Sequence, residues 1–309
     1  MHVEILGSAA GGGFPQWNCA CRNCSLLRSG AFPGKARTQL QVVVSSDRVS
    51  WCLLNASPDL RVQIESNSLL HPRGGSRNSP ISAVVLTSAD LDQSLGLLLL
   101  RELQPIQIFA ATSIRRILRE DNSMFSMLNR RAEQARWHDI APGTAFKLFA
   151  TAREQSQIEC LPLSVATRYP SYVTTERAGQ LVPGEAALGL ILRSESGKRL
   201  GYFPAVGQLN QALLDHLDSL DVLLFDGTFW SDDELITIQN GGQTARQMGH
   251  IPVSSATGSL DLLSKLHCPR KIFVHINNTN PMLDVTGPEY RQVRESGWEI
   301  AEDGCHLEL

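Results

Sequence analysis

The stretch AVVLTSADLDQSLGLLLLRE, residues 83–102, constrains the fold of this 309-residue chain more than any other segment. Its first four residues are an apolar run of strand length, and residues 91–103 have the length and leucine content of a buried helix. A polar turn, residues 87–93, joins the two. Because a turn after the carboxyl end of a buried strand can direct side chains toward a ligand, we expect Asp90 and Asp92 to lie at a functional site.

A second interpretation of the same turn is purely structural. Asp90 can cap the amino end of the helix, with Gln93 as its partner three residues later. Such a capping box satisfies free backbone amides and needs no metal. The turn alone does not separate the two interpretations.

Composition and charge exclude several classes of function. With 42% hydrophobic and 19% charged residues and a net charge of −3, the chain has the composition of a globular protein and no basic footprint for nucleic acid. No apolar run reaches the roughly 18 residues of a membrane span. The amino end lacks the pattern of a secretion signal, so we expect a cytoplasmic protein. We expect one domain over residues 1–309, and a homodimer is one assembly that the sequence leaves open.

The amino-terminal segment, about residues 14–30, contains a cysteine cluster. Cys19, Cys21 and Cys24 have the spacing Cys-x-Cys-x-x-Cys, which allows three thiolates to converge on one tetrahedral ion. We predict a structural zinc here, with the fourth ligand left open between His275 and Asn278. Redox chemistry at Cys21 and Cys24 is a less favoured alternative, because no clear helix is evident after them.

The remaining pattern suggests alternating strands and helices. Three glycines at 11–13 require a tight turn or a close approach to another group. Periodicity predicts strands at 2–6, 37–46, 50–54, 106–110, 146–150 and 157–162, a helix at 113–120, and a helical then irregular segment at 125–140. Residues 71–80 and 168–183 are expected to be loops, the second either a solvated connector or a contact to substrate.

Two later strands also end in polar residues. Asp226 follows the apolar run VLLF, and His275 follows IFV. If these ends lie on one rim of a sheet, Asp92, Asp226 and His275 can meet. Carboxylates with imidazole and open coordination positions suit non-haem iron. Taken singly, Asp226 is also explained by an Asp-Gly turn and His275 by a hydrogen-bonded strand end.

Seven motifs now carry a resemblance that covers nearly the whole chain. They read GSAAGGGFPQWNCACRNC, LTSADLD, GLLLLRE, YFPAVGQL, LLFDGTFWSDDE, MGHIPVSS and HINNTNP. In these motifs the chain resembles the coenzyme PQQ synthesis protein B family. The resemblance implies an α/β metallo-β-lactamase-like αββα sandwich, in which two mixed β-sheets are flanked by helices.

The resemblance also implies a part in making pyrroloquinoline quinone (PQQ) from a ribosomal peptide. One implied role is iron-dependent hydroxylation of the tyrosine ring in the peptide-derived Glu-Tyr precursor. The other is carriage of PQQ or its precursor toward the periplasm without transforming it. The implied ligands of the iron, Fe(II), are Asp92, Asp226 and His275, with His250 as an acid/base or orienting group and Asp90 beside the metal.

The chain departs from the pattern at several ligand positions. The metallo-β-lactamase loop reads His-x-His-x-Asp-His, and only Asp92 matches it here. Ser88, Asp90 and Gln93 replace the loop histidines, and Ser164 or a neighbour replaces a further one. Two-metal hydrolysis requires both ions, so a hydrolase or phosphodiesterase is the weaker alternative.

Overall fold

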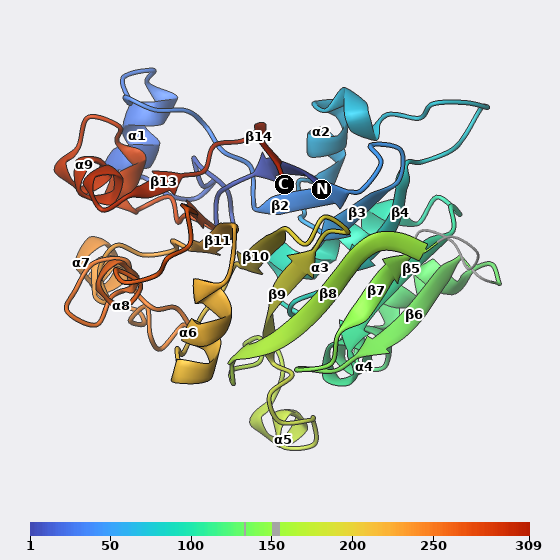
Figure 1. Ribbon diagram of the computed structural model, residues 1–309. Helices are drawn as coiled ribbons and strands as arrows, with labels where there is room; N and C mark the ends of the chain where they lie inside the picture. Colours follow the sequence, from blue (N-terminus) through green and yellow to red (C-terminus); the bar gives the residue numbers. More distant parts are fainter. Residues whose placement is uncertain (133, 150–154) are drawn as a thin grey trace.

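Two seven-stranded sheets form the centre of the computed structural model, which describes residues 1–132, 134–149 and 155–309 (Figure 1). The first sheet has the order β14 (Cys305–Glu308), β1 (His2–Gly7), β2 (Gln41–Ser45), β3 (Trp51–Leu54), β4 (Ile81–Val85), β5 (Ile106–Ala111) and β6 (Ala135–Ile140). The second has the order β13 (Trp298–Ile300), β12 (Arg270–Val274), β11 (Val222–Asp226), β10 (Arg199–Phe203), β9 (Ala187–Arg193), β8 (Gln155–Ala166) and β7 (Phe146–Phe149).

Both sheets are mixed in the same way. In the first, the pairs from β14 to β3 are antiparallel and those from β3 to β6 are parallel. In the second, the pairs from β7 to β10 are antiparallel and those from β10 to β13 are parallel. The parallel strands place the carboxyl ends of neighbouring strands at one edge of each sheet, where ligands bind in open α/β sheets.

Helices connect the strands. The α-helices are α1 (Arg22–Arg28), α2 (Leu60–Glu65), α3 (Leu91–Ser94), α4 (Thr112–Arg119), α5 (Thr175–Ala178), α6 (Gln211–Asp218), α7 (Glu234–Gln239), α8 (Ser259–Leu262) and α9 (Pro288–Glu295). The 3₁₀ helices are η1 (Ser68–Leu70), η2 (Leu95–Leu100), η3 (Ser123–Asn129) and η4 (Pro281–Leu283). α4 packs on β5 and β6, and α9 packs on β13. None of the helices in the described part of the chain has the length and apolarity that a membrane crossing requires.

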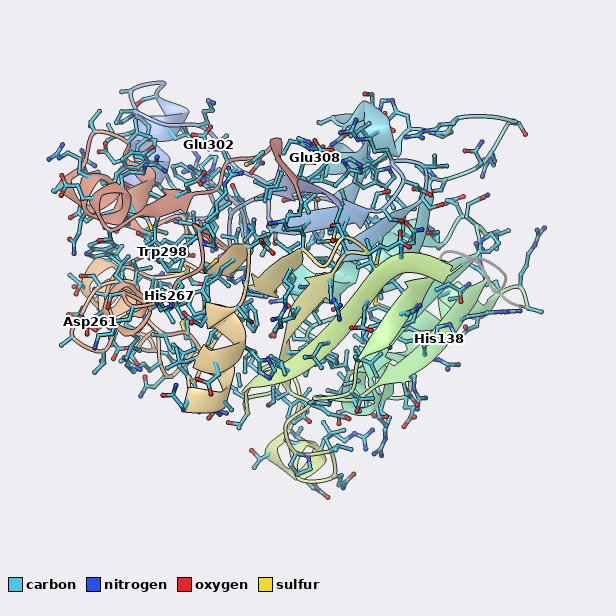
Figure 2. All side chains as sticks on the ribbon, in the orientation of Figure 1. His138, Asp261, His267, Trp298, Glu302 and Glu308 are labelled. Carbon is cyan, nitrogen blue, oxygen red and sulfur yellow. The ribbon has the colours of Figure 1, made fainter. Side chains whose placement is uncertain are left out.

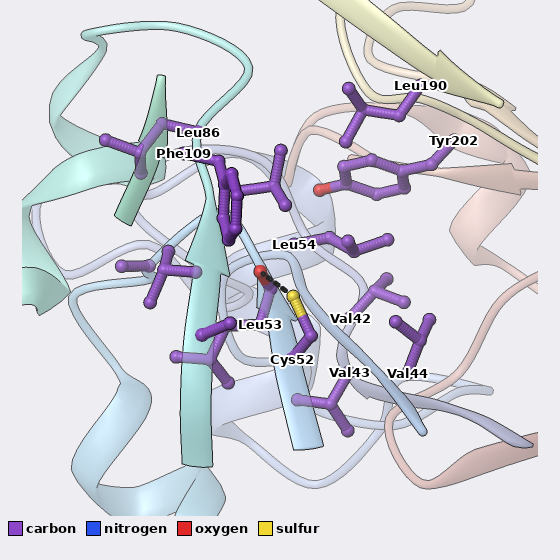
Figure 3. Close-up of a cluster of buried hydrophobic side chains, with 14 of the residues drawn as sticks. Val42, Val43, Val44, Cys52, Leu53, Leu54, Leu86, Phe109, Leu190 and Tyr202 are labelled. Atoms are coloured by element: carbon purple, nitrogen blue, oxygen red, sulfur yellow. Dashed lines mark hydrogen bonds between the residues drawn. The ribbon is translucent and has the colours of Figure 1, made fainter. Parts of the chain in front are cut away.

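The main core lies between the two sheets. Figure 3 shows Leu190 and Tyr202 of the second sheet facing Val42, Leu54 and Phe109 of the first. All five side chains are buried. This apolar contact between inner faces holds the sheets together.

A second cluster covers the outer face of the second sheet. Along β11, Leu224 faces the core between the sheets, whereas Leu223 and Phe225 belong to the outer cluster. This alternation follows from the two-residue period of a strand. The ring of Phe273 stacks on that of Trp298, which is labelled in Figure 2, at 4.2 Å between centroids. Both faces of this sheet are therefore buried, and the predicted fold class is confirmed.

The expected helix at 91–103 is only partly correct. α3 ends at Ser94, and the 3₁₀ helix η2 follows up to Leu100. A Cβ atom on Gly96 would lie 2.2 Å from the carbonyl oxygen of Ser57, so the chain approaches another backbone closely here. This close packing accounts for the tighter winding.

The expectation for residues 125–140 is wrong in its second half. η3 covers part of it, but residues 135–140 form β6, which pairs in parallel with β5 at the edge of the sheet. Short, half-buried edge strands carry a weak apolar signal. The strand expected at 37–46 begins only at Gln41, and Ala150 of the strand expected at 146–150 lies outside the described residues.

Candidate metal centre and pocket

Asp226 and His275 lie at the carboxyl ends of two neighbouring parallel strands. Asp226 is the last residue of β11 and pairs with Val274, the last of β12, so His275 follows directly beside it. Asp226 is fully buried and His275 is 5% exposed. His275 has a φ of 56°, a conformation that is costly for a residue with a Cβ and that occurs preferentially at functional sites.

Asp92 reaches the same point from the other sheet. It lies in the first turn of α3, after β4, and its Oδ2 is 2.8 Å from Nε2 of His275. The sequence predicted that Asp92, Asp226 and His275 could meet. In the structure, Asp92 contacts His275 directly, and Thr228 links His275 to Asp226.

The hydroxyl of Thr228 connects the site internally. Its Oγ1 lies 2.6 Å from Oδ1 of Asp226 and 2.8 Å from Nδ1 of His275. The carboxylate can only accept, so Thr228 donates its proton to Asp226 and accepts the Nδ1 proton of His275. With Nδ1 bonded to Thr228, Nε2 is the nitrogen of His275 that donates to Asp92, and it is the nitrogen that could bind a metal in place of this hydrogen bond.

His250, from the MGH motif, lies on the other side of Asp226. Its Nδ1 is 2.7 Å from Oδ2 of Asp226, and its ring stacks on that of His275 at 5.6 Å. Potential ligand atoms of Asp226, His250 and His275 all lie within 4.8 Å of one another. His250 therefore lies directly beside Asp226 and His275, and its position fits either a metal ligand or an acid/base group.

Burial and mutual charge set the ionisation of the site. Burial alone would raise the pKa of Asp92 and Asp226, but the hydrogen bond from His275 to Asp92 and the charge of His250 facing Asp226 lower both. Burial lowers the pKa of His250, but the Asp226 carboxylate outweighs it and the pKa is raised. Burial and the charge of Asp92 raise the pKa of Asp90. The site therefore holds at least two carboxylates in their charged form.

The capping-box interpretation is wrong. Asp90 occupies the capping position of α3, but its side chain makes no capping hydrogen bond and instead accepts one from the hydroxyl of Ser88 at 2.8 Å. The Gln93 side chain points into a buried polar network. Its Oε1 accepts hydrogen bonds from Asn55 and Thr87 at 3.0 and 2.7 Å, and it lies 3.2 Å from the Ser88 hydroxyl.

A pocket of about 550 Å³ opens over these groups. Asp90, Asp92, Gln93, His250 and His275 line it, whereas Ser164 does not. The remaining walls come from the glycine run, from residues 168–172 and from residues 243–249.

Two of these walls answer questions that the sequence left open. Gly12 and Gly13 adopt positive φ, and Gly11 lies against Asp92, so the glycines both turn tightly and approach the site. Tyr172 in the loop at 168–183 donates a hydrogen bond to the carbonyl of Ala89. That loop therefore lines the pocket and is tied to the turn that carries Asp92.

The three clustered cysteines also converge. Sulfur atoms of Cys19, Cys21 and Cys24 lie within 4.8 Å of one another. The side-chain amide of Asn278 faces all three, with its nitrogen 3.1, 3.7 and 3.3 Å from their respective sulfurs. Rotating the side-chain amide by a half turn exchanges the positions of its nitrogen and oxygen, and the oxygen then faces the three sulfurs. Asn278 is therefore the side chain that faces the three sulfurs, whereas His275 lies at the pocket.

The expectation that no helix follows these cysteines is wrong, because α1 begins directly after Cys21. The thiol of Cys21 nevertheless does not resemble an activated redox group, since burial raises its pKa to about 11. Cys52, Cys160 and Cys268 are buried, and Cys305 is half-buried.

The two sets of donor atoms suit different metals. Three thiolates and an amide oxygen suit zinc, whereas carboxylates and imidazoles with space for further ligands suit iron or another hard to borderline ion. Donor atoms around one ion lie about 3 Å apart. Asp92 and His275 lie 2.8 Å apart, and His250 and Asp226 lie 2.7 Å apart, so each pair is spaced like two ligands of one ion.

The chain is similar to proteins of one family over its whole length. The family model "Beta-lactamase superfamily domain" matches residues 50–276. "Coenzyme PQQ synthesis protein B" of Pseudomonas paraeruginosa is 40% identical over 311 residues, and that of Methylorubrum populi is 40% identical over 309, each covering 100% of both chains.

Solved structures agree with this relationship. The crystal structure of Zn²⁺-bound PqqB from Methylobacterium extorquens matches with a TM-score of 0.91 and 39% identity over 100% of both chains. A diphosphatase from the PhnP family matches with a TM-score of 0.68 at 20% identity, covering 100% of this chain and 96% of that one. The second likeness concerns the fold alone.

Proposed function

The chain belongs to the coenzyme PQQ synthesis protein B family, which acts in PQQ biosynthesis, and we propose that it hydroxylates the tyrosine ring of a peptide-derived Glu-Tyr precursor with one Fe(II). The observation that carries the proposal is a group of potential ligands, Asp226, His250 and His275, to which Asp92 is joined through His275 at 2.8 Å, beside a pocket that Asp92, His250 and His275 line. This is a single group of carboxylates and imidazoles with open space in front of it, as iron-dependent oxygenation requires.

Asp92, Asp226 and His275 would hold the metal. When bound, the iron supplies the dioxygen chemistry. In the overall reaction a ring C–H bond becomes C–OH with one oxygen atom of O₂, and the other atom leaves as water with two electrons from an added reductant. Thr228 and the backbone N–H of Val206, 2.9 Å from Oδ2, keep Asp226 oriented.

His250 would accept the proton of the substrate's phenol group. Its Nδ1 is engaged with Asp226, so its second ring nitrogen is available as a base on a residue that lines the pocket. Asp90, whose pKa is raised, lies on the same wall and would accept or donate a hydrogen bond to the substrate. Tyr172 would hold the loop at 168–183 against the pocket through Ala89.

The decisive test is oxygen incorporation. Protein loaded anaerobically with Fe(II) is exposed to ¹⁸O₂ with a reductant and the Glu-Tyr dipeptide, and products are analysed by mass spectrometry. We expect the gain of one labelled oxygen on the tyrosine ring, absent in His275→Ala. His250→Gln should keep bound iron and lose most of the rate. Wild-type protein that demonstrably binds iron but adds no oxygen contradicts the proposal.

A carrier role for PQQ or its precursor is the second candidate, and one observation favours it. Gln93 is held by Asn55, Thr87 and Ser88, so the loop offers Asp92 but no imidazole. A carrier role predicts that PQQ binds with micromolar affinity, about −8 kcal/mol. Binding that is unchanged after metal removal, without any turnover of the ligand, would support this role. Metal-dependent hydrolysis is weaker still, because Ser88 and Asp90 stand where a second ion needs histidines.

Two further assignments complete the proposal. We infer one zinc at Cys19, Cys21 and Cys24 with Asn278 as fourth ligand, in a segment of about residues 14–30 of a single domain over 1–309. We also infer that the protein works in the cytoplasm and binds a small peptide-derived precursor.

A further inference from the structure

The pocket walls carry a marked imbalance of charge. Asp90 and Asp92 line the base, and the only Lys or Arg among the described lining residues is Arg168. Arg168 follows the carboxyl end of β8, and it lies in the same loop as Tyr172. Arg168 can therefore bind the anionic part of a ligand at a distance from Asp90 and Asp92.

The guanidinium of Arg168 is held in place by neutral groups. One Nη donates to the carbonyl of Gln247, and the other lies 3.5 Å from Oε1 of Gln243. Both partners belong to the segment at 243–249, which leads to His250, and Gln243 itself lines the pocket. The side chain thus spans two walls of the pocket.

Arg168 forms no ion pair with any residue that the structure describes. No carboxylate in the described ranges lies within ion-pairing distance of it, in contrast to Arg177 in the same loop, which is 2.8 Å from Asp121. The contact to Gln243 is at the limit of a hydrogen bond. One edge of the planar guanidinium is therefore available for a carboxylate, which it can bind with two parallel hydrogen bonds.

We propose that Arg168 is the specificity-determining residue of the pocket and binds a substrate carboxylate. This inference rests on the proposed function and deepens it, since it defines the substrate as an acidic amino-acid derivative. The reacting ring then points toward Asp92 and His275, and the carboxylate remains at the wall formed by residues 168–172 and 243–249. A neutral compound of the same shape lacks this anchor.

The test compares two probes on holoprotein under anaerobic conditions. Glu-Tyr carries free carboxylates, and Gln-Tyr-amide has nearly the same shape without them. Calorimetry should show that wild type prefers the acid by about tenfold or more, because hydrogen bonds to charged groups contribute roughly 1.5–3 kcal/mol each. Arg168→Gln should remove most of this preference and leave the affinity for the amide unchanged.

Two variants separate binding from structure. Arg246→Gln removes the same charge from the neighbouring wall, where Arg246 bonds to Thr257 and does not line the pocket, so the preference should persist. Arg168→Lys keeps the charge without the planar fork and should retain an intermediate preference.

The outcomes distinguish this inference from the proposed function. If Arg168→Gln weakens acid and amide equally, or if wild type shows no preference, the carboxylate assignment is overturned. Oxygen incorporation by wild type then still supports hydroxylation. If the acid preference depends on Arg168 but no oxygen is added, the inference holds and the chemistry fails.

Discussion

The two ring nitrogens of His275 have different partners: Nδ1 lies 2.8 Å from the hydroxyl of Thr228, and Nε2 faces Asp92. Thr228 therefore selects the tautomer in which Nε2 can bind a metal. We predict that Thr228→Val, which keeps the shape but removes the hydroxyl, weakens Fe(II) binding by about 10- to 100-fold.

Thr228→Ser is the matched control for this prediction. It retains the hydroxyl and should bind iron within a few-fold of wild type. Both affinities can be measured by anaerobic competition with a coloured Fe(II) chelator. Equal affinity in Thr228→Val and wild type would show that this hydrogen bond does not orient His275 for a metal.

Gln93 gives a second prediction. Gln93→His places an imidazole beside Asp92, and it should tighten Fe(II) binding about tenfold, equivalent to 1.4 kcal/mol. The same change removes the acceptor of the hydrogen bonds from Asn55 and Thr87, so we expect a loss of about 1 kcal/mol or more in unfolding free energy.

Chelator competition and urea unfolding measure the two effects separately. Asp92→Ala is the reference variant and should weaken iron binding. If neither Gln93→His nor Asp92→Ala alters the affinity, the turn at 87–93 does not bind metal in this protein.

The cysteine site should contribute to stability rather than to chemistry. Replacing Cys19, Cys21 and Cys24 together by serine should remove one zinc per chain and lower the melting temperature, because structural zinc contributes directly to folding. Asn278→Ala should weaken zinc by about tenfold, or about 1.4 kcal/mol, and Asn278→Asp should restore it. Metal analysis and thermal melts check this, and a triple variant with full zinc content and unchanged melting would refute the site.

Glu234 predicts a defined pH dependence. It is buried at the start of α7, accepts the N–H of Trp230 at 2.6 Å and contacts the hydroxyl of Thr279. Burial raises the pKa of Glu234 from 4.5 to about 7. Between pH 4.5 and about 7 the carboxyl group of Glu234 is protonated in the folded protein and ionised in the unfolded chain. The stability that this group contributes is therefore complete below pH 4.5 and is lost as the pH rises through 7.

Glu234→Gln mimics the neutral form and tests this sign. Raising the pH from about 5 to about 8 should lower the unfolding free energy of wild type relative to the variant by at most about 3 kcal/mol. Urea denaturation of both proteins at the two pH values gives the difference. A difference that is constant, or that favours wild type at high pH, would contradict the assignment.

Apolar strand runs and their polar ends were predictable from the sequence. Asp226 and His275 could be expected to meet because both follow buried strands that pair in parallel. The helix after Leu91 was overestimated, because the contact of Gly96 with the Ser57 backbone is a tertiary effect.

Several functional residues carried no signal of their own. Thr228, Tyr172 and Arg168 are of common types, and only the folded geometry shows what their side chains contact. The motif FDGTFW contains Thr228, and the two tyrosines marked the loop at 168–183, but neither pattern states a role. Likewise, the capping-box pattern of Asp90 and Gln93 fitted the sequence, but Asp90 bonds to its neighbour Ser88, and Gln93 bonds to Asn55, which is distant in the sequence.

Metal stoichiometry tests the central claim most directly. Protein purified without chelators is dialysed anaerobically against Fe(II), and zinc and iron are counted per chain in wild type and in Asp226→Ala. We predict one zinc and one iron in wild type, and one zinc without iron in the variant. Iron that is absent from wild type, that exceeds one per chain in the pocket, or that persists in Asp226→Ala would contradict a single iron held by Asp92, Asp226 and His275.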